Sequence, residues 1–432
     1  MISAFSSTFT LVFTVRAMQD DPRTVWSDVA WTFGGNLVGQ GMGFAAMILL
    51  ANALGPSEYG RFSWAVAWMW IAAELSDGGV TTTSIRLSAP YFRDEIHRAH
   101  ALFKGALWIR IGIAGCLLTA GAVVSRFALP PAVRMVFWIG FLGAIGLSLW
   151  LFVSSYLQAR QWFHKNALLN GTTHFLKLVG IVGLVLLGKM ALWSSLSVYA
   201  LAPFLGVGIG LGWMPLRALW RQPSDTGTLR EFVHFSKWVL LVLLCDVLYE
   251  RLDILMLSHL RGPWDVGIYA AAKRLSLLAP ILSGSLVTAF LPKASALMGI
   301  GELHLYVRRV WSVAGLCLVP MGLLLLVSAP LVHMIYTSDY GPSLPVFKIL
   351  LGAFSLTLWI YPMGLLMYAL HRPQMMALVH GVQLVVNFVG NLFLIPLYGS
   401  KGAAMATLAS TLTLGGLVAG WMYVRLRGEH RA

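Results

Sequence analysis

Long apolar stretches recur along the whole chain, and each has about 20 residues or more. An apolar helix of this length crosses the roughly 30 Å hydrocarbon core of a bilayer. A helix is required because a lipid-exposed backbone must satisfy its own hydrogen bonds. Charged residues make up only 11% of the chain, against roughly 25% in soluble domains. The sequence therefore predicts an all-α polytopic membrane protein. We expect twelve spans, at 28–54, 62–87, 104–125, 134–157, 168–189, 193–214, 233–257, 266–292, 309–335, 344–370, 375–396 and 399–424.

Lysine and arginine are unevenly divided between the loops on the two sides of these spans. We count nineteen on the side that holds the amino terminus and six on the other. Cytoplasmic loops carry the excess of basic residues, so we predict a cytoplasmic (inner) membrane protein with both termini in the cytoplasm. Basic loops that face an anionic leaflet also account for the net charge of +14 without a nucleic-acid partner.

One eight-residue pattern, Gly-Pro-x-acid-x-Gly-x-aromatic, occurs twice. It lies at Gly55–Phe62 and again, 207 residues later, at Gly262–Tyr269. The same offset aligns Trp31 with Trp238 without a gap. A match in one register over about 60 positions indicates a duplicated unit, although chance similarity between two Gly-Pro turns is the alternative.

Each copy of the duplicated unit contains six spans. An even number of spans returns the chain to the same side, so the copies have parallel topology about a pseudo-two-fold axis along the membrane normal. This predicts a cytoplasmic N-terminal segment, two six-helix lobes, a cytoplasmic linker and a cytoplasmic tail. Their expected bounds are 1–27 for the N-terminal segment, 28–214 and 233–424 for the lobes, 215–232 for the linker and 425–432 for the tail.

The sequence contains no arrangement of residues that is typical of an enzyme. Cys116, Cys245 and Cys317 each lie inside a predicted span, and their spacing fits neither a metal site nor a disulfide framework. The chain has no GxxxxGK[ST] loop for binding phosphates. We therefore predict no enzyme activity, no cofactor and no metal site.

Charged residues inside spans are rare, costly and often functional. In span 7, Asp246, Glu250 and Asp253 are spaced i, i+4 and i+7 and so share one helix face. Lys273 and Arg274 lie at a matching depth in span 8, and we expect one of them to meet Glu250. The cluster is either a structural salt bridge or a site in a water-filled cavity that binds a substrate group or a coupling ion.

A second set of buried charges lies in spans 2 and 3. Glu74 and Asp77 are spaced i, i+3, and Asp77 opens the sequence Asp77-Gly78-Gly79-Val80. The paired glycines weaken the helix and permit a bend. Arg110 enters from the cytoplasmic side about a turn shallower than Asp77, and its long side chain makes it the expected partner of Asp77 and, less readily, of Glu74. This pair too is either a plain ion pair or part of a functional site.

Two polar features remain in spans 1 and 5. Asn36 and Gln40 form an i, i+4 stripe, which suits a hydroxyl-rich ligand but also suits hydrogen bonds between helices. Lys177 is a single cation inside span 5.

The same segments carry a resemblance to a known family. Leu50–Gly60 resembles the junction of spans 1 and 2 in bacterial polysaccharide flippases of the Wzx type. Asp77-Gly78-Gly79-Val80, followed by Arg86, is similar to that family's D-x-G-x…R pattern. The segments Asp253–Met256 and Gly267–Ala272 look like its second-lobe signature. One departure is that Ala51-Asn52-Ala53 stands where the family often has a basic residue.

The resemblance implies a MATE-like fold with two pseudo-symmetric lobes and a V-shaped central cavity. It also implies translocation of an undecaprenyl-diphosphate-linked oligosaccharide across the cytoplasmic membrane, by alternating access coupled to a proton or sodium. Its expected partners are this polyprenyl-diphosphate-linked oligosaccharide, the coupling ion, the lipid bilayer, a polymerase and other polysaccharide-assembly proteins. The same superfamily includes cation-coupled multidrug exporters and peptidoglycan-precursor flippases, which are the alternatives.

A diphosphate headgroup calls for cationic side chains in the cavity, and coupling to an ion calls for carboxylates. A membrane scaffold without transport activity would need neither buried charges nor a repeat. The predicted substrate-binding residues are Arg110, Lys177, Lys273, Arg274, Asn36 and Gln40, and the predicted ion-coupling residues are Asp77, Asp246, Glu250 and Asp253.

Overall fold

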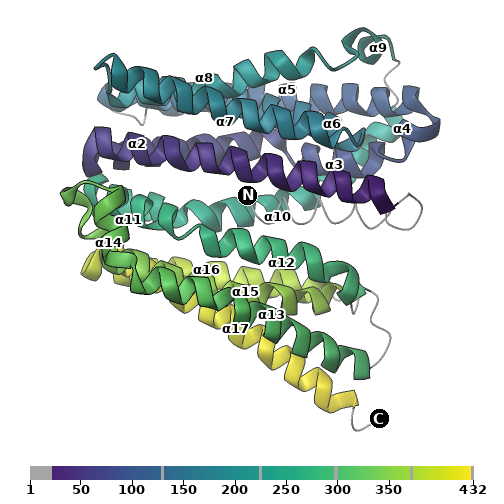
Figure 1. The fold of residues 1–432 in the computed structure, drawn as a ribbon. Helices are drawn as coiled ribbons and strands as arrows, with labels where there is room; N and C mark the ends of the chain where they lie inside the picture. The colour runs from purple at the N-terminus through teal and green to yellow at the C-terminus, as the bar shows by residue number, and fades with distance from the viewer. Residues whose placement is uncertain (1–21, 128–130, 223–225, 296–299, 370–372, 430–432) are drawn as a thin grey trace. The chain divides into compact units, whose positions relative to one another are not determined.

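In a computed structural model, the chain is a succession of α-helices joined by short connections (Figure 1). The structure describes residues 22–127, 131–222, 226–295, 300–369 and 373–429. Within these ranges it contains no β-strand. The predicted all-α fold is therefore confirmed.

The two Gly-Pro turns adopt the same backbone conformation. Helix α2 (Pro22–Asp77) is two helices joined at Gly55, whose φ of 73° and ψ of 169° lie outside the helical region. Gly262 has φ 98° and ψ −179° and precedes α11 (Pro263–Leu275). Glycine tolerates the positive φ, and proline fits the first position of the helix that follows. The repeated motif therefore builds the same turn twice.

The two turns also pack against each other. A β-carbon added to Gly60 would overlap the carbonyl oxygen of Pro263, and one added to Gly267 would overlap that of Pro56. The offset of 207 residues exchanges these two contacts, because it relates Gly60 to Gly267 and Pro56 to Pro263. The glycines of the motif are thus required for a close approach of backbones that obeys the symmetry of the repeat.

Three buried tyrosines pack beside the turns. Tyr59, in the first turn, lies edge-on to Tyr340, with 6.4 Å between the ring centroids. Tyr340 is tilted against Tyr336 at 5.0 Å, and the Tyr336 hydroxyl donates to the carbonyl of Ala271 at 3.3 Å. Burial raises the pKa of both the Tyr336 and the Tyr340 phenol, so these side chains stay protonated.

The described chain divides into two compact units. The first Gly-Pro turn, at Gly55–Arg61, belongs to the unit that contains the C-terminal half of the chain. What we call the N-terminal unit comprises the described residues up to Leu54 and Phe62–Leu248; the C-terminal unit comprises Gly55–Arg61 and the described residues from Tyr249 onward. The division falls inside α10 (Thr226–Leu260), rather than in the connection 215–232.

In the N-terminal unit, α6, α7 and α8 run side by side (Figure 1). Helix α3 begins where Gly78 (φ 61°) and Gly79 (φ 73°) end α2, so the predicted bend is present. Helix α3 packs against both α5 and α6. The remaining helices of this unit are α3 (Val80–Ser88), α4 (Tyr91–Asp94), α5 (Ile96–Phe127), α6 (Pro131–Ala159), α7 (Phe163–Leu186), α8 (Leu192–Leu211) and α9 (Leu216–Arg221).

In the C-terminal unit, α15 contacts α11, α12, α13 and α17, and α16 packs along α17. Helices α11 and α12 meet at a bend of 46°. The helices after α11 are α12 (Leu278–Ser295), α13 (Ile300–Leu326), α14 (Ser328–Ile335), the 3-10 turn η1 (Ser338–Tyr340), α15 (Ser343–Ala369), α16 (Pro373–Tyr398) and α17 (Ser400–Glu429).

Nine helices within the described ranges are long and apolar enough to cross a membrane, or ten when α11 and α12 count as one bent span. One of the nine runs from Leu37 to Asp77 through the turn at Gly55, so it contains parts of two predicted spans. Helix α10 covers the predicted span 233–257, but some of its side chains lie outside the described part. These two helices account for the difference from the twelve predicted spans.

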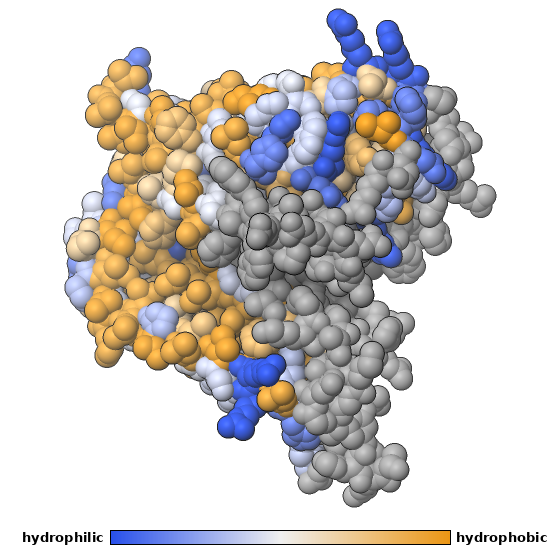
Figure 2. All heavy atoms as spheres, turned by 45° about the vertical axis from the view of Figure 1, so that its right-hand side comes forward, coloured by the Kyte–Doolittle hydropathy of each residue, from blue (hydrophilic) through white to orange (hydrophobic). Residues whose placement is uncertain are grey.

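Side chains on these helices are distributed as in membrane proteins. On α16, Phe393 and Val385 are exposed, whereas Asn387 and Asn391 are fully buried. On the face seen in Figure 2, hydrophobic side chains cover a broad area, and hydrophilic ones gather toward the top and bottom of the view. Apolar surfaces thus face outward, and polar groups are buried between helices, where other helices satisfy their hydrogen bonds.

Candidate functional site: two buried charge clusters

A buried ion pair joins α2 to α5 in the N-terminal unit. The Arg110 guanidinium contacts the Asp77 carboxylate, and the side chains are 2% and 1% exposed. Arg110 also donates to the Thr81 hydroxyl at 2.9 Å and to the carbonyl of Ser148. The predicted pairing of Arg110 with Asp77 is therefore present, and it links α2, α3, α5 and α6.

The helix break at Gly78-Gly79 positions the Asp77 carboxylate at the amino end of α3. There the carboxylate accepts the Thr81 amide at 3.2 Å and the Thr81 hydroxyl at 2.5 Å. A helix amino terminus favours negative charge, so Asp77 has two sources of stabilisation, the α3 terminus and Arg110. Among the polar atoms of Arg110, Nε has no hydrogen-bond partner.

Lys177 lies elsewhere in the N-terminal unit. Its buried side chain on α7 places Nζ 4.1 Å from the centre of the Tyr199 ring on α8, a cation–π arrangement. Gln40 is half-buried on α2. The Asn36 side chain lies outside the described part of the structure. The Asp77–Arg110 pair joins α2 to α5, whereas Lys177 lies between α7 and α8, so these predicted site residues occupy different places.

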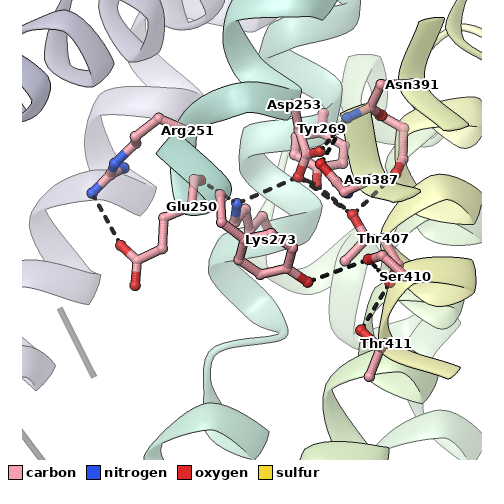
Figure 3. A network of polar contacts seen from close by, with 12 residues as sticks. Glu250, Arg251, Asp253, Tyr269, Lys273, Asn387, Asn391, Thr407, Ser410 and Thr411 are labelled. Carbon is pink, nitrogen blue, oxygen red and sulfur yellow. Dashed lines mark hydrogen bonds and ion pairs between the residues drawn. The ribbon is translucent and has the colours of Figure 1, made fainter. Parts of the chain in front are cut away.

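The second cluster surrounds Asp253 in the C-terminal unit (Figure 3). The Asp253 carboxylate on α10 accepts hydrogen bonds from the Tyr269 hydroxyl on α11, from Asn391 Nδ2 on α16 at 2.8 Å and from the Thr407 hydroxyl on α17 at 3.3 Å. Lys273 Nζ on α11 lies 3.7 Å from the same carboxylate. One buried acid thus connects four helices.

Lys273 corrects the expected pairing across spans 7 and 8. Its Nζ does reach Glu250, but it donates to the backbone carbonyl at 2.7 Å. Its carboxylate partner is Asp253 rather than Glu250. The Glu250 carboxylate lies 4.0 Å from Arg251 and is 32% exposed. The sequence prediction compared only the depths of residues along two helices. Such depths cannot distinguish Glu250 from Asp253, which lie one turn apart on the same helix.

The three acids of span 7 therefore have different surroundings. Asp253 is buried, while Asp246 and Glu250 are half-buried. Asp246 belongs to the N-terminal unit, and Glu250 and Asp253 belong to the C-terminal unit. Arg274 is half-buried on α11. Sharing one helix face does not give these carboxylates a common role.

Sequence reasoning missed the uncharged members of the Asp253 cluster. Further hydrogen bonds extend this network. The Tyr249 hydroxyl on α10 accepts from Gln383 Nε2 at 2.8 Å and lies 3.4 Å from the Ser410 hydroxyl. The missed signal is the spacing of polar residues inside two apolar spans, which places them on one buried helix face. These residues are Gln383, Asn387 and Asn391 on α16, and Thr407, Ser410 and Thr411 on α17.

Two atoms of this cluster lack hydrogen-bond partners. They are Asn391 Oδ1 and Asn387 Nδ2, and both residues are completely buried. Asn391 Nδ2 also donates to Asn387 Oδ1 at 3.0 Å. Within the described residues, no group of three or more His, Cys, Asp or Glu side chains is placed to hold a metal ion. The Asp253 site thus combines one carboxylate, neutral hydroxyl and amide groups, and the Lys273 ammonium.

Apolar helices that bury ion pairs and a carboxylate network define a polytopic membrane protein with internal polar sites. The chain belongs to a particular family of such proteins. Its residues 25–298 match the family described as polysaccharide biosynthesis protein. The family resemblance found in the sequence is thereby confirmed.

Two relatives from Haloferax volcanii are similar in sequence. The probable low-salt glycan biosynthesis flippase Agl15 is 23% identical over 394 residues, which cover 88% of this chain and 79% of that protein. The probable flippase AglR is 31% identical over 182 residues, which cover 40% of this chain and 37% of that protein.

Solved structures with the same fold include two transporters. The lipid II flippase MurJ, in an inward closed conformation, has a TM-score of 0.75 at 12% identity, with 91% of this chain and 87% of that chain covered. An inward-facing multidrug resistance MATE family transporter of the MOP superfamily has a TM-score of 0.68 at 12% identity, with 91% and 96% covered. These likenesses show the fold alone, and they confirm the predicted MATE-like class.

Proposed function

We propose that this protein is a flippase that moves a polyprenyl-diphosphate-linked oligosaccharide from the cytoplasmic to the outer leaflet of the cytoplasmic membrane. The observation that carries the proposal is the match to the polysaccharide biosynthesis family over residues 25–298. The relative Agl15, which aligns with 88% of this chain, is itself named a probable flippase of glycan biosynthesis. An undecaprenyl carrier remains our expectation for the lipid.

Lys177, Lys273 and Arg274 are our candidates for contacts with the diphosphate. Lysine binds phosphate as a point charge and arginine binds it through a planar fork. The Lys273 side chain is 20% exposed, whereas that of Lys177 is buried. Arg110 was predicted for the same role, but its guanidinium is held by Asp77, Thr81 and Ser148. We therefore assign Arg110 to holding α5 against the break between α2 and α3.

Asp253 is our candidate for ion coupling, in preference to Glu250, Asp246 and Asp77. Its carboxylate is buried, and it receives hydrogen bonds from three helices besides its own. A change in its charge would therefore affect the packing of α10, α11, α16 and α17 together. Asp77 is already paired with the buried Arg110, and loss of one partner of such a pair leaves the other charge stranded.

Deletion of the gene tests this function in cells. The deletion strain should lose its surface glycan and accumulate lipid-linked oligosaccharide that stays on the cytoplasmic side. The wild-type gene and the Lys348→Gln variant should both restore the glycan, because Lys348 is exposed near the start of α15. Lys177→Ala should restore little, at equal protein level in the membrane. A normal surface glycan in the deletion strain, with altered drug efflux instead, would favour the multidrug-exporter alternative.

A further inference from the structure

The charge balance around Asp253 rests on one cation from the protein itself. Tyr269, Asn391 and Thr407 offer neutral donors to the carboxylate. Among the described contacts of Asp253, only Lys273 brings a positive charge. A buried carboxylate without a cation is costly, so the ammonium of Lys273 neutralises the site in this structure.

Lys273 and Asp253 form an ion pair without a hydrogen bond. The distance of 3.7 Å from Nζ to Oδ2 is that of an ion pair, but it is too long for a hydrogen bond. The short contact of Lys273 is instead to the backbone carbonyl of Glu250, at 2.7 Å. Lys273 is 20% exposed and Asp253 only 3%. Lys273 is therefore the more exposed member of the pair, and its four-carbon stem is flexible.

Asn391, which donates to the Asp253 carboxylate, has a side-chain oxygen without a hydrogen-bond partner among the described residues. Asn391 places Nδ2 on Asp253 Oδ1 at 2.8 Å, and its own Oδ1 is buried without a hydrogen bond. A buried acceptor that forms no hydrogen bond is energetically unfavourable. The amide oxygen, the Thr407 hydroxyl and the Asp253 carboxylate are oxygen groups of the kind that a hard cation prefers as ligands.

We propose that Lys273 is a built-in competitor of the coupling cation, whose ammonium neutralises Asp253 until a small monovalent cation replaces it. The inference rests on the ion coupling at Asp253 in the proposed function and goes one step further. It makes the ion and the lysine alternative partners of one carboxylate. A released Lys273 carries an uncompensated positive charge, so cation binding strengthens attraction of a substrate diphosphate. That is a positive coupling between the two ligands.

Sodium is the probe for a direct test with the purified full-length protein. The melting temperature is measured against sodium chloride, with choline chloride to hold the ionic strength constant. Lys273→Gln keeps a side-chain donor for the Glu250 carbonyl but removes the charge. Its half-saturating sodium concentration should fall by about tenfold or more, because a competing state lowers apparent affinity by its population. Lys273→Arg keeps a competing cation, so its half-saturating sodium concentration should not fall below that of the wild type.

Two further variants complete the comparison. Lys348→Gln makes the same substitution at an exposed lysine of the same unit, and its sodium response should match that of the wild type. Asp253→Asn should abolish the response. If wild-type protein responds to sodium and Lys273→Gln has the same half-saturation, the competition is disproved, while ion coupling stands. If wild-type protein does not respond at all, ion coupling by sodium at Asp253 is disproved with it.

Should Lys273→Gln fail to fold, the Lys273→Arg protein still decides the matter. Arginine is more weakly hydrated than lysine and forms bidentate pairs with carboxylates. A tighter internal partner should shift half-saturation to higher sodium, whereas a purely structural lysine would leave it unchanged. A lower half-saturating concentration in Lys273→Arg would contradict the proposal.

Discussion

Gly60 and Gly267 occupy equivalent positions in the two Gly-Pro turns, and each lies against the proline carbonyl of the other turn. The contact is reciprocal, as in a symmetric dimer, where one surface patch meets its own copy. It lies within the C-terminal unit, to which Gly55–Arg61 belongs. The two copies of the Gly-Pro motif, which the sequence shows as a repeat, thus pack directly against each other.

Replacing either glycine by alanine should disturb this packing. The added β-carbon of Gly60→Ala would meet the backbone of Pro263, and that of Gly267→Ala would meet the backbone of Pro56. Neither neighbour is a flexible side chain that can move aside. Overpacking of this kind costs about 1–3 kcal/mol, so each variant should melt several degrees below the wild type in detergent.

Gly352→Ala is the matched control for this prediction. It places alanine in α15 of the same unit, where nothing lies within 4 Å of the added atom. Alanine favours a helix over glycine by about 1 kcal/mol, so this variant should be as stable as the wild type or more so. Equal melting temperatures for Gly60→Ala and Gly352→Ala would show that the turns do not pack this closely.

The Asp77–Arg110 pair should behave as a structural unit. Arg110→Ala leaves a buried carboxylate without its cation, which costs about 3–5 kcal/mol. Asp77→Asn in the same protein should recover part of the loss, because the amide oxygen still accepts the Thr81 amide while no charge is stranded. The measurements are the melting temperature and the amount of folded protein in the membrane.

The double variant also distinguishes the two roles considered for Arg110. A structural role requires that Asp77→Asn with Arg110→Ala transports better than Arg110→Ala alone. If instead the double variant is folded at wild-type levels yet inactive, Arg110 contacts the substrate, and the assignment made above is wrong.

Asp253 and Glu250 should differ in their effect on ion dependence. Asp253→Asn keeps the shape of the side chain but cannot change its charge, so transport should be slow and independent of sodium and pH. Glu250→Gln should keep the wild-type dependence, because the Glu250 carboxylate is 32% exposed and the substitution leaves the backbone carbonyl that accepts from Lys273. Transport is measured as surface glycan against sodium concentration and pH. If only Glu250→Gln loses the ion dependence, the coupling residue is Glu250 and not Asp253.

The basic residues predict the orientation in the membrane. A reporter that is active only outside the cytoplasm should be silent when fused after Ala432. The same reporter should be active when inserted near Ser338, between α14 and α15. Fusions at both sites are compared at equal expression. Activity at Ala432 together with silence at Ser338 would reverse the orientation.

The sequence predicts features that depend on local chemistry. Gly55-Pro56 and Gly262-Pro263 predicted repeated turns. Glycine permits the positive φ that such a turn requires, and proline fixes φ and interrupts a preceding helix. Asp77-Gly78-Gly79 predicted a bend, and depth along the helices predicted the partner of Asp77. These inferences succeed because each uses one helix or one pair of neighbouring helices.

Features that depend on several helices were not predicted. Asn391 and Thr407 approach Asp253 from α16 and α17, and no pattern near Asp253 points to those helices. Uncharged residues also attract less notice than charges in an apolar span, although burial makes their hydrogen bonds just as necessary. Lys273 meets Glu250 only through its backbone carbonyl and pairs with the Asp253 carboxylate, since the choice between the two acids depends on helix rotation.

Reconstitution of the purified protein in proteoliposomes tests the central claim most directly. A polyprenyl-diphosphate-linked oligosaccharide is placed in both leaflets, and a membrane-impermeant glycosidase is added outside. With the wild-type protein, nearly all of the oligosaccharide should become accessible over time, whereas liposomes without protein should stay near half. Lys177→Ala should slow this exposure at equal reconstitution. Accessibility that stays near half with folded wild-type protein, across sodium gradients and pH gradients of either direction, would contradict the flippase function.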